Sequence, residues 1–252
     1  MKNLLITFFL ISCFTALGQE AKETKIIVRT RAKDAKFIGT SMGGSMIIIK
    51  DAMTNEVLAK GLTEGGTGNT DAIMNMPHER YTPLAFGAAA FEARLTLQKP
   101  LFVTIEAIAP VNHDSKVMAQ TQTWVIPGKH LDGDGIILEI PGFVVDGLFP
   151  QTHQGFSIEK DKNIELKANI VMMCGCTISQ GGTWDSDQVE VEAAIYVDGT
   201  YWKTITMNIA EENTFTANLD LEKTGSHEVI ISAYHPTSKN SGVNQLNFRV
   251  SN

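Results

Sequence analysis

The chain of 252 residues lacks the short motifs that mark common enzyme classes. It has no G-x-S-x-G elbow, no H-E-x-x-H pair, no phosphate-binding loop and no G-x-G-x-x-G turn after a strand. His78-Glu79 and His113-Asp114 are adjacent acid–base pairs, but neighbouring side chains of an extended chain point to opposite faces. Neither pair therefore forms a dyad by itself, and the sequence predicts a protein without catalytic activity.

Positive charge is in short supply. Lysine and arginine together number 21 against 28 aspartates and glutamates, which gives a formal charge of −7. Nucleic acids and anionic membrane surfaces both attract a basic face. The balance therefore excludes nucleic acid as an expected partner, and it is compatible with binding cations, proteins or neutral sugars.

Long apolar runs are missing except near the N-terminus, so no transmembrane helix is expected. Lys2, the apolar run Leu4 to Phe14 and the cleavage site Ala16-Leu17-Gly18 predict a signal peptide over residues 1–18. Leu10-Ile11-Ser12-Cys13 also fits a lipobox, which leaves open a lipoprotein anchored through Cys13. Either pattern predicts that the mature protein is secreted or periplasmic.

The rest of the chain shows strand patterns rather than helical periodicity. Short β-branched or apolar runs alternate with glycine-rich turns, as expected for strands at residues 25–30, 45–50, 56–63, 92–97, 101–109, 120–126 and 136–140. Regular alternation over 164–172 and 189–197 begins a second series, in which Asp198-Gly199 predicts a two-residue hairpin. Four further strands are expected near 205–209, 215–221, 227–234 and 243–250, in an up-and-down order.

These patterns predict an all-β protein with two β-sandwich domains in tandem. The first domain is expected over residues 24–148 and the second over 163–252. The polar, aperiodic segment 149–162 is expected to be the linker between them.

Two resemblances support this architecture. Ser45 to Gly61 contains a strand, the turn Asp51-Ala52-Met53-Thr54-Asn55 and a second strand ending at glycine. This resembles the opening hairpin of carboxypeptidase-regulatory-like, or transthyretin-like, β-sandwiches, which implies an accessory module of secreted and envelope proteins without an activity of its own. The second domain resembles an immunoglobulin-like sandwich in its strand spacing, although the disulfide between the sheets is absent.

Cysteine is scarce, and its spacing is the sharpest chemical feature. Of three cysteines, Cys13 lies in the predicted signal peptide, which leaves Cys174 and Cys176 on either side of Gly175. Residues two apart in a strand are separated by roughly 6.6 Å, at the outer edge of what a disulfide allows. A disulfide between them would therefore require a tight turn at Gly175, which glycine can supply.

A soft-metal site is the alternative to a redox-active or structural disulfide. If the strand continued in extended form, Met172, Cys174 and Cys176 would share one face and offer the thioether and thiolate ligands that Cu(I) prefers. An up-and-down strand order would bring His235 to the same end as a fourth ligand. A third possibility is that both cysteines are free thiols packed as small hydrophobic groups.

Three further patterns have a structural and a functional interpretation. Met74, Met76 and His78 form a second soft-ligand cluster, but two methionines filling gaps in a core are the favoured interpretation. Asp132-Gly133-Asp134-Gly135 starts like a calcium loop, yet a strand follows at once, so a hairpin turn is expected. Trp184 and Tyr201 could form a sugar-binding platform, whereas a tryptophan at the end of a sandwich more often closes the core.

Together these patterns predict an exported, non-catalytic binding or structural module of the cell envelope or extracellular space, acting with an unidentified protein or envelope partner. One alternative is a copper-binding or copper-delivery protein that holds Cu(I) through Met172, Cys174, Cys176 and His235. The other is a thiol–disulfide redox protein that uses Cys174 and Cys176.

Overall fold

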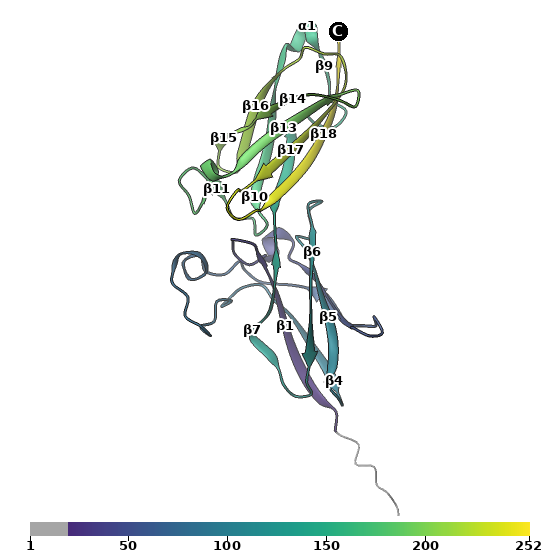
Figure 1. Ribbon diagram of the computed structural model, residues 1–252, viewed down its shortest axis with the longest axis vertical. Coiled ribbons are helices and arrows are strands. Elements are labelled where there is room, and N and C mark those ends of the chain that lie inside the picture. The colour runs from purple at the N-terminus through teal and green to yellow at the C-terminus, as the bar shows by residue number, and fades with distance from the viewer. Residues whose placement is uncertain (1–19) are drawn as a thin grey trace, which may run out of the picture.

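A computed structural model describes residues 20–252, so the predicted signal peptide and the lipobox at Cys13 lie outside the described residues. The described chain is built almost entirely of strands, which confirms the all-β, β-sandwich fold class. The strands form two groups of sheets stacked end to end along the long axis of the molecule (Figure 1). None of the helices within residues 20–252 has the length and apolar character needed to cross a bilayer.

The first group, here called the N-terminal sandwich, has a three-stranded and a four-stranded sheet. The first sheet has the order β4-β1-β7 and the second β3-β2-β5-β6. Side chains alternate along β5, where Val103, Ile105 and Ala107 are fully buried and form part of the core. The strands are β1 (Lys22–Ala32), β2 (Met46–Asp51), β3 (Val57–Leu62), β4 (Phe91–Leu97), β5 (Leu101–Ala109), β6 (Val117–Val125) and β7 (Leu131–Ile140).

The second group, here called the C-terminal sandwich, has sheets of the orders β15-β16-β10-β8 and β14-β13-β17-β18-β9. Its core joins the buried faces of β10 and β13, as their alternation predicts. The strands are β8 (Phe143–Phe149), β9 (Gly155–Ser157), β10 (Asn163–Met172), β13 (Glu190–Val197), β14 (Thr200–Thr206), β15 (Asn208–Glu211), β16 (Thr214–Asp220), β17 (Gly225–Tyr234) and β18 (Ser241–Ser251).

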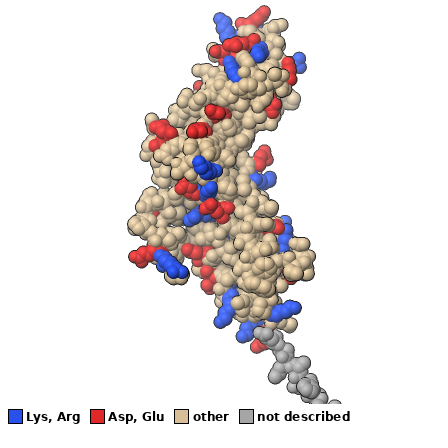
Figure 2. Space-filling view, viewed as in Figure 1, with Lys and Arg blue, Asp and Glu red and all other residues tan. Residues whose placement is uncertain are grey.

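Short elements fill the connections. Two-residue strands β11 (Ile178–Ser179) and β12 (Trp184–Asp185) pair in parallel between β10 and β13. The helical turns are η1 (Thr40–Met42), the π-helix η2 (Asp71–Asn75), α1 (Ile158–Asp161) and η3 (Ser186–Gln188). Charged side chains of both signs are intermixed over both sandwiches on the face shown in Figure 2.

The expected hairpin at Asp198-Gly199 forms, and both residues adopt positive φ (48° and 77°), as a type I′ turn requires. The expected up-and-down order is wrong, because β10 lies between β16 and β8 in one sheet and β13 lies in the other. The alternation over 205–209 does not belong to one strand, because β14 pairs with β13 whereas β15 pairs with β16 in the opposite sheet. The chain changes sheets at Met207, whose N–H donates to the carbonyl of Val191 at 2.8 Å.

The strand pairing places the boundary between the sandwiches earlier in the chain than expected. β8 pairs antiparallel with β10, from Phe143 opposite Met172 to Phe149 opposite Lys167, so it belongs to the C-terminal sandwich. The expected linker, 149–162, instead contains α1 and β9, which pairs in parallel with β18. We infer that the two domains divide at Pro141-Gly142, between β7 and β8.

Candidate functional site

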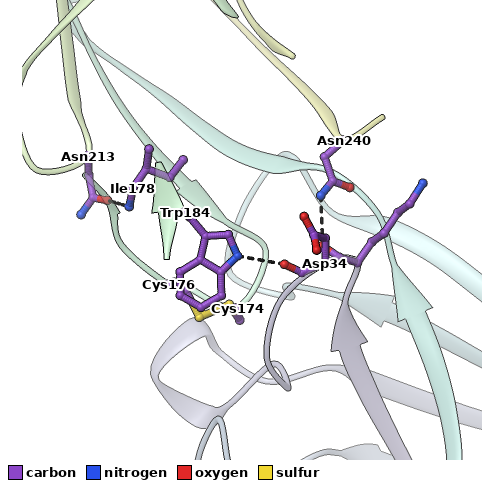
Figure 3. Close-up of a disulfide and its surroundings, with 8 residues drawn as sticks. Asp34, Cys174, Cys176, Ile178, Trp184, Asn213 and Asn240 are labelled. Atoms are coloured by element: carbon purple, nitrogen blue, oxygen red, sulfur yellow. Dashed lines mark hydrogen bonds between the residues drawn. A yellow bond between two sulfur atoms is a disulfide. The ribbon is translucent and has the colours of Figure 1, made fainter. Parts of the chain in front are cut away.

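The Cys174-Gly175-Cys176 segment forms a tight turn directly after β10 ends at Met172. The Gly175 N–H donates to the Met172 carbonyl at 2.7 Å, and the Met172 N–H donates to the Cys176 carbonyl at 3.3 Å. Gly175 adopts a φ of +73°, a conformation that glycine accepts without steric cost. Cys174 and Cys176 are joined by a disulfide across this turn, with their Cα atoms 5.3 Å apart (Figure 3). The turn that a disulfide at this spacing requires is therefore present.

The four predicted metal ligands are not brought together. Met172 and His235 line a small cavity of about 50 Å³, whereas the two cysteines line a separate cleft. Thr183 and Trp184 border both spaces. The strand ends at Met172 and the chain turns there instead of continuing in extended form. The expected approach of His235 to the cysteines stays a prediction.

Both ring nitrogens of His235 already have partners. Its Nδ1 accepts a hydrogen bond from the Ser238 N–H at 3.0 Å, which places the ring proton of neutral His235 on Nε2. That nitrogen lies 3.4 Å from the Gln188 Oε1. Within residues 20–252 no three His, Cys, Asp or Glu side chains are grouped to hold a metal ion. A disulfide offers no thiolate, so the residues in this state do not fit Cu(I), and copper binding stays a prediction for the reduced protein.

The disulfide contributes little as a covalent constraint on folding. In the chain-entropy account, a bond that closes a ring of about three residues stabilises the fold by only about 1.6 kcal/mol, against about 4.7 kcal/mol for a 100-residue loop. The two cysteines are separated by two positions in the sequence. Their bond therefore fixes one turn and does not join distant parts of the C-terminal sandwich.

The disulfide forms part of the wall of a cleft between the two sandwiches, with a volume of about 460 Å³. Its lining is mostly polar and combines hydroxyl groups, one ammonium group, one carboxylate and one indole. The N-terminal sandwich contributes Lys36, Ser41 and Thr67, and the C-terminal sandwich contributes Cys174 to Thr177, Ser179, Thr183, Trp184 and Glu212. The cleft is the candidate functional site, because residues of both sandwiches and the disulfide meet there.

Asn240 holds the two sandwiches together beside this cleft. Its Nδ2 donates to the Lys33 carbonyl at 3.0 Å, and its Oδ1 accepts from the Gly142 N–H at 2.8 Å. The side chain is fully buried, so both bonds are shielded from water. Nothing in the local sequence Lys239-Asn240-Ser241 distinguishes this asparagine from an ordinary turn residue.

Two more contacts cross the junction. The Trp184 Nε1 donates to the Asp34 carbonyl at 2.8 Å (Figure 3), which favours the structural interpretation of this tryptophan. The turn at Gly175 lies against η1, since a Cβ atom added to this glycine would be 2.5 Å from the Sδ of Met42. Met42 was not a candidate from the sequence, where methionine in a glycine-rich turn carries no specific signal.

The other candidate residues lie away from the cleft or have structural roles. Met74 belongs to the π-helix η2 and is half-buried, whereas Met76 and His78 are exposed in the following loop, so the three do not form an extended strand. Tyr201 packs against Tyr196 beyond the Asp198-Gly199 hairpin, at the opposite end of β13 from Trp184. The two aromatic residues therefore do not form one platform.

The Asp132-Gly133-Asp134-Gly135 segment forms an irregularity within β7, where the register against β1 shifts, and the expectation of a hairpin turn is wrong. The Asp134 carboxylate accepts hydrogen bonds from the N–H groups of Leu84 and Ala85, at 2.8 and 3.1 Å. The Asp132 carboxylate lies 3.7 Å from the Lys25 Nζ. Asp134 thus anchors the base of the long loop between β3 and β4.

A buried histidine lies at the far end of the C-terminal sandwich. His227 stacks on Phe248 with ring centroids 5.0 Å apart, and its Nδ1 lies 3.3 Å from the Gly225 carbonyl. Its Nε2 is buried without a hydrogen-bond partner among the described residues. Burial lowers the pKa of His227 below its usual value, and the hydrogen bond to Gly225 and the charge of Asp198 oppose this only in part.

Comparison with known proteins shows no family. No protein-family model matches the chain, and no curated protein does. Among solved structures, the chain is similar to fibronectin(III)-like modules of CbhA from Clostridium thermocellum, with 11% identity over 90% of this chain and 94% of that chain and a TM-score of 0.29. It is also similar to a Corynebacterium diphtheriae structure described as a membrane anchored protein, with 10% identity, 96% and 47% coverage and a TM-score of 0.28.

A third similarity, to Escherichia coli alpha-2-macroglobulin activated by porcine elastase, has 8% identity, covers 94% of this chain and 22% of that chain, and has a TM-score of 0.23. All three superpositions are too loose to support an inference about activity or partners.

Proposed function

We propose that the protein is an exported, non-catalytic structural module of the cell envelope or extracellular space, whose two sandwiches act as one elongated unit. The observation that carries the proposal is the fully buried Asn240, which bonds to backbone groups of both sandwiches. Separating the sandwiches would break the bond from the Asn240 Nδ2 to the Lys33 carbonyl and expose both groups to water. An intramolecular hydrogen bond contributes about 0.5–1.5 kcal/mol net, so the end-to-end arrangement is favoured over free rotation.

The proposed role follows from the shape and from the exposed junction. Two sandwiches fixed end to end hold a binding surface at a set distance from an attachment point, and they place residues of both domains around one polar cleft. Export is supported by the N-terminal pattern of Lys2, the apolar run and the Ala16-Leu17-Gly18 site.

Small-angle X-ray scattering on the mature chain tests the elongated unit. We expect the scattering profile to match one end-to-end arrangement, with the same maximum dimension at low and high salt. A profile that requires a broad set of relative domain orientations would contradict the proposal.

Cell fractionation with mass spectrometry of the N-terminus tests export. We expect the full chain to be recovered outside the cytoplasm, beginning at Gln19 or, if it is a lipoprotein, at a lipidated Cys13. Recovery of an unprocessed chain in the cytoplasm would overturn the assigned location and would leave the scattering result unaffected.

A further inference from the structure

We propose that the Cys174–Cys176 disulfide is a thiol–disulfide exchange site that a dithiol reductant reaches through the cleft between the sandwiches. This inference is independent of the structural role proposed above. It rests on three observations. Backbone hydrogen bonds hold the turn without the disulfide, both cysteines line the cleft, and the other residues that line the cleft are mostly polar.

The turn is held by groups other than the disulfide. The Gly175 N–H bonds to the Met172 carbonyl and the Met172 N–H to the Cys176 carbonyl, so two backbone hydrogen bonds hold the segment that contains the disulfide. Following the turn, the Ile178 N–H donates to the Asn213 Oδ1 at 2.8 Å, which fixes the chain as it leaves (Figure 3). Breaking the sulfur–sulfur bond therefore leaves the fold intact, as a reversible exchange requires.

The disulfide lies in the wall of the cleft. Both cysteines line the cleft together with Gly175, and Met42 packs close to this glycine. Both cysteines are buried, but Cys176 is 8% exposed against 2% for Cys174, so Cys176 is the more accessible of the two to an incoming thiolate. Lys36 lines the same cleft and its positive charge favours a thiolate, whereas Glu212 carries the opposing charge at the rim.

The exchange is a two-electron reduction in two steps. A thiolate of the reductant attacks the Sγ of Cys176, the bond between the two cysteines breaks, and Cys174 leaves as a thiolate that takes up a proton. The second thiolate of the reductant then attacks the reductant's first sulfur, which is bonded to Cys176 in the mixed disulfide. Cys176 leaves as a thiolate and is protonated, and the reductant carries away the disulfide.

Competition between reduction and unfolding tests the assignment on the wild-type chain. Protein is treated with dithiothreitol either in native buffer or in urea, quenched with maleimide at timed intervals and weighed by mass spectrometry. We expect the native disulfide to be reduced at a rate within tenfold of that in urea. A native rate more than tenfold slower would show that the bond opens only on unfolding, and would overturn the proposal.

Two controls separate exchange from a bond that is merely reducible. The Cys174→Ser, Cys176→Ser double variant gives the labelling background, and a cooperative thermal transition of the reduced wild type shows that the fold survives. In intact cells, rapid acid quenching and alkylation should reveal both oxidised and reduced chains. A population that is fully oxidised in cells, or a reduced chain without a cooperative transition, would each contradict an exchange site.

Discussion

The side-chain amide of Asn240 donates to the carbonyl oxygen of Lys33 at 3.0 Å, across 207 positions of sequence. The same side chain accepts from the N–H of Gly142, the residue at which the chain passes between the sandwiches. One amide group thus binds the start of the turn after β1 to the start of the C-terminal sandwich.

Asn240→Ala should weaken the junction. The substitution leaves two buried backbone groups without partners, so we expect the free energy of unfolding to fall by about 2–4 kcal/mol. Urea denaturation measures this loss. Asn247→Ala, on an exposed position of β18, is the matched control and should change stability by less than about 0.5 kcal/mol. Equal effects of the two variants would show that the bridge contributes nothing specific.

Gly175→Ala should be more destabilising than Gly181→Ala. Both glycines adopt positive φ, so each substitution carries a backbone cost of about 1 kcal/mol. Only at Gly175 would the new methyl group collide with Met42, and overpacking adds about 1–3 kcal/mol. Adding Met42→Ala to Gly175→Ala should recover part of the difference in thermal denaturation. No recovery would place the cost in the backbone alone.

His227 should make the protein less stable in mild acid. Its folded-state pKa is lowered by burial, so the unfolded chain takes up the proton first as the pH falls through about 6.5. Stability is therefore full above about pH 6.5, is lost progressively below that value, and levels off once the pH lies below the folded-state pKa.

His227→Phe should reduce this acid-side loss, because phenylalanine retains the stacking on Phe248 and does not titrate. Urea denaturation at about pH 7.5 and about pH 5 measures the difference. His78→Gln, in an exposed loop, serves as the control and should leave the pH dependence unchanged. An unchanged pH dependence in His227→Phe would assign the effect to other groups.

Asp134→Ala should release the base of the loop between β3 and β4. The N–H groups of Leu84 and Ala85 would lose their carboxylate acceptor, and their hydrogen exchange should accelerate at least about tenfold. Asp132→Ala removes only a partly exposed ion pair with Lys25 and should leave those two amides protected. Equal protection in both variants would contradict the anchoring role of Asp134.

Local patterns in the sequence predicted the local structure well. The alternation along β10 and β13 and the hairpin at Asp198-Gly199 follow from side-chain period and turn chemistry. The turn at Gly175 was expected only for the disulfide among the alternatives. Pairing partners were not predictable in this way. The run Phe143 to Phe149 would suit the last strand of one sandwich as well as the first strand of the next, and only its register against Met172 decides between them.

The change of sheet at Met207 was equally unpredictable. The period-two pattern continues from Ile205 through Met207 to Ile209 even though the hydrogen-bond partner changes at Met207, so the sheet crossing leaves no mark in the sequence.

The positions of the candidate ligands were also not predictable from residue spacing. His235 and Met172 line one cavity, whereas the two cysteines line a different cleft. Which cavity a side chain lines depends on tertiary packing, which residue spacing does not determine.

The Asn240 bridge also sets an order for assembly during synthesis. Every strand of the N-terminal sandwich lies before residue 141, so that sandwich can close while the remainder of the chain is still emerging. The Lys33 carbonyl gains its bond to Asn240 only after residue 240 has been made and the β17–β18 connection has formed. Throughout that interval the Lys33 carbonyl and the neighbouring surface of the cleft are open, and this is when a nascent chain would be most exposed to wrong association with another copy.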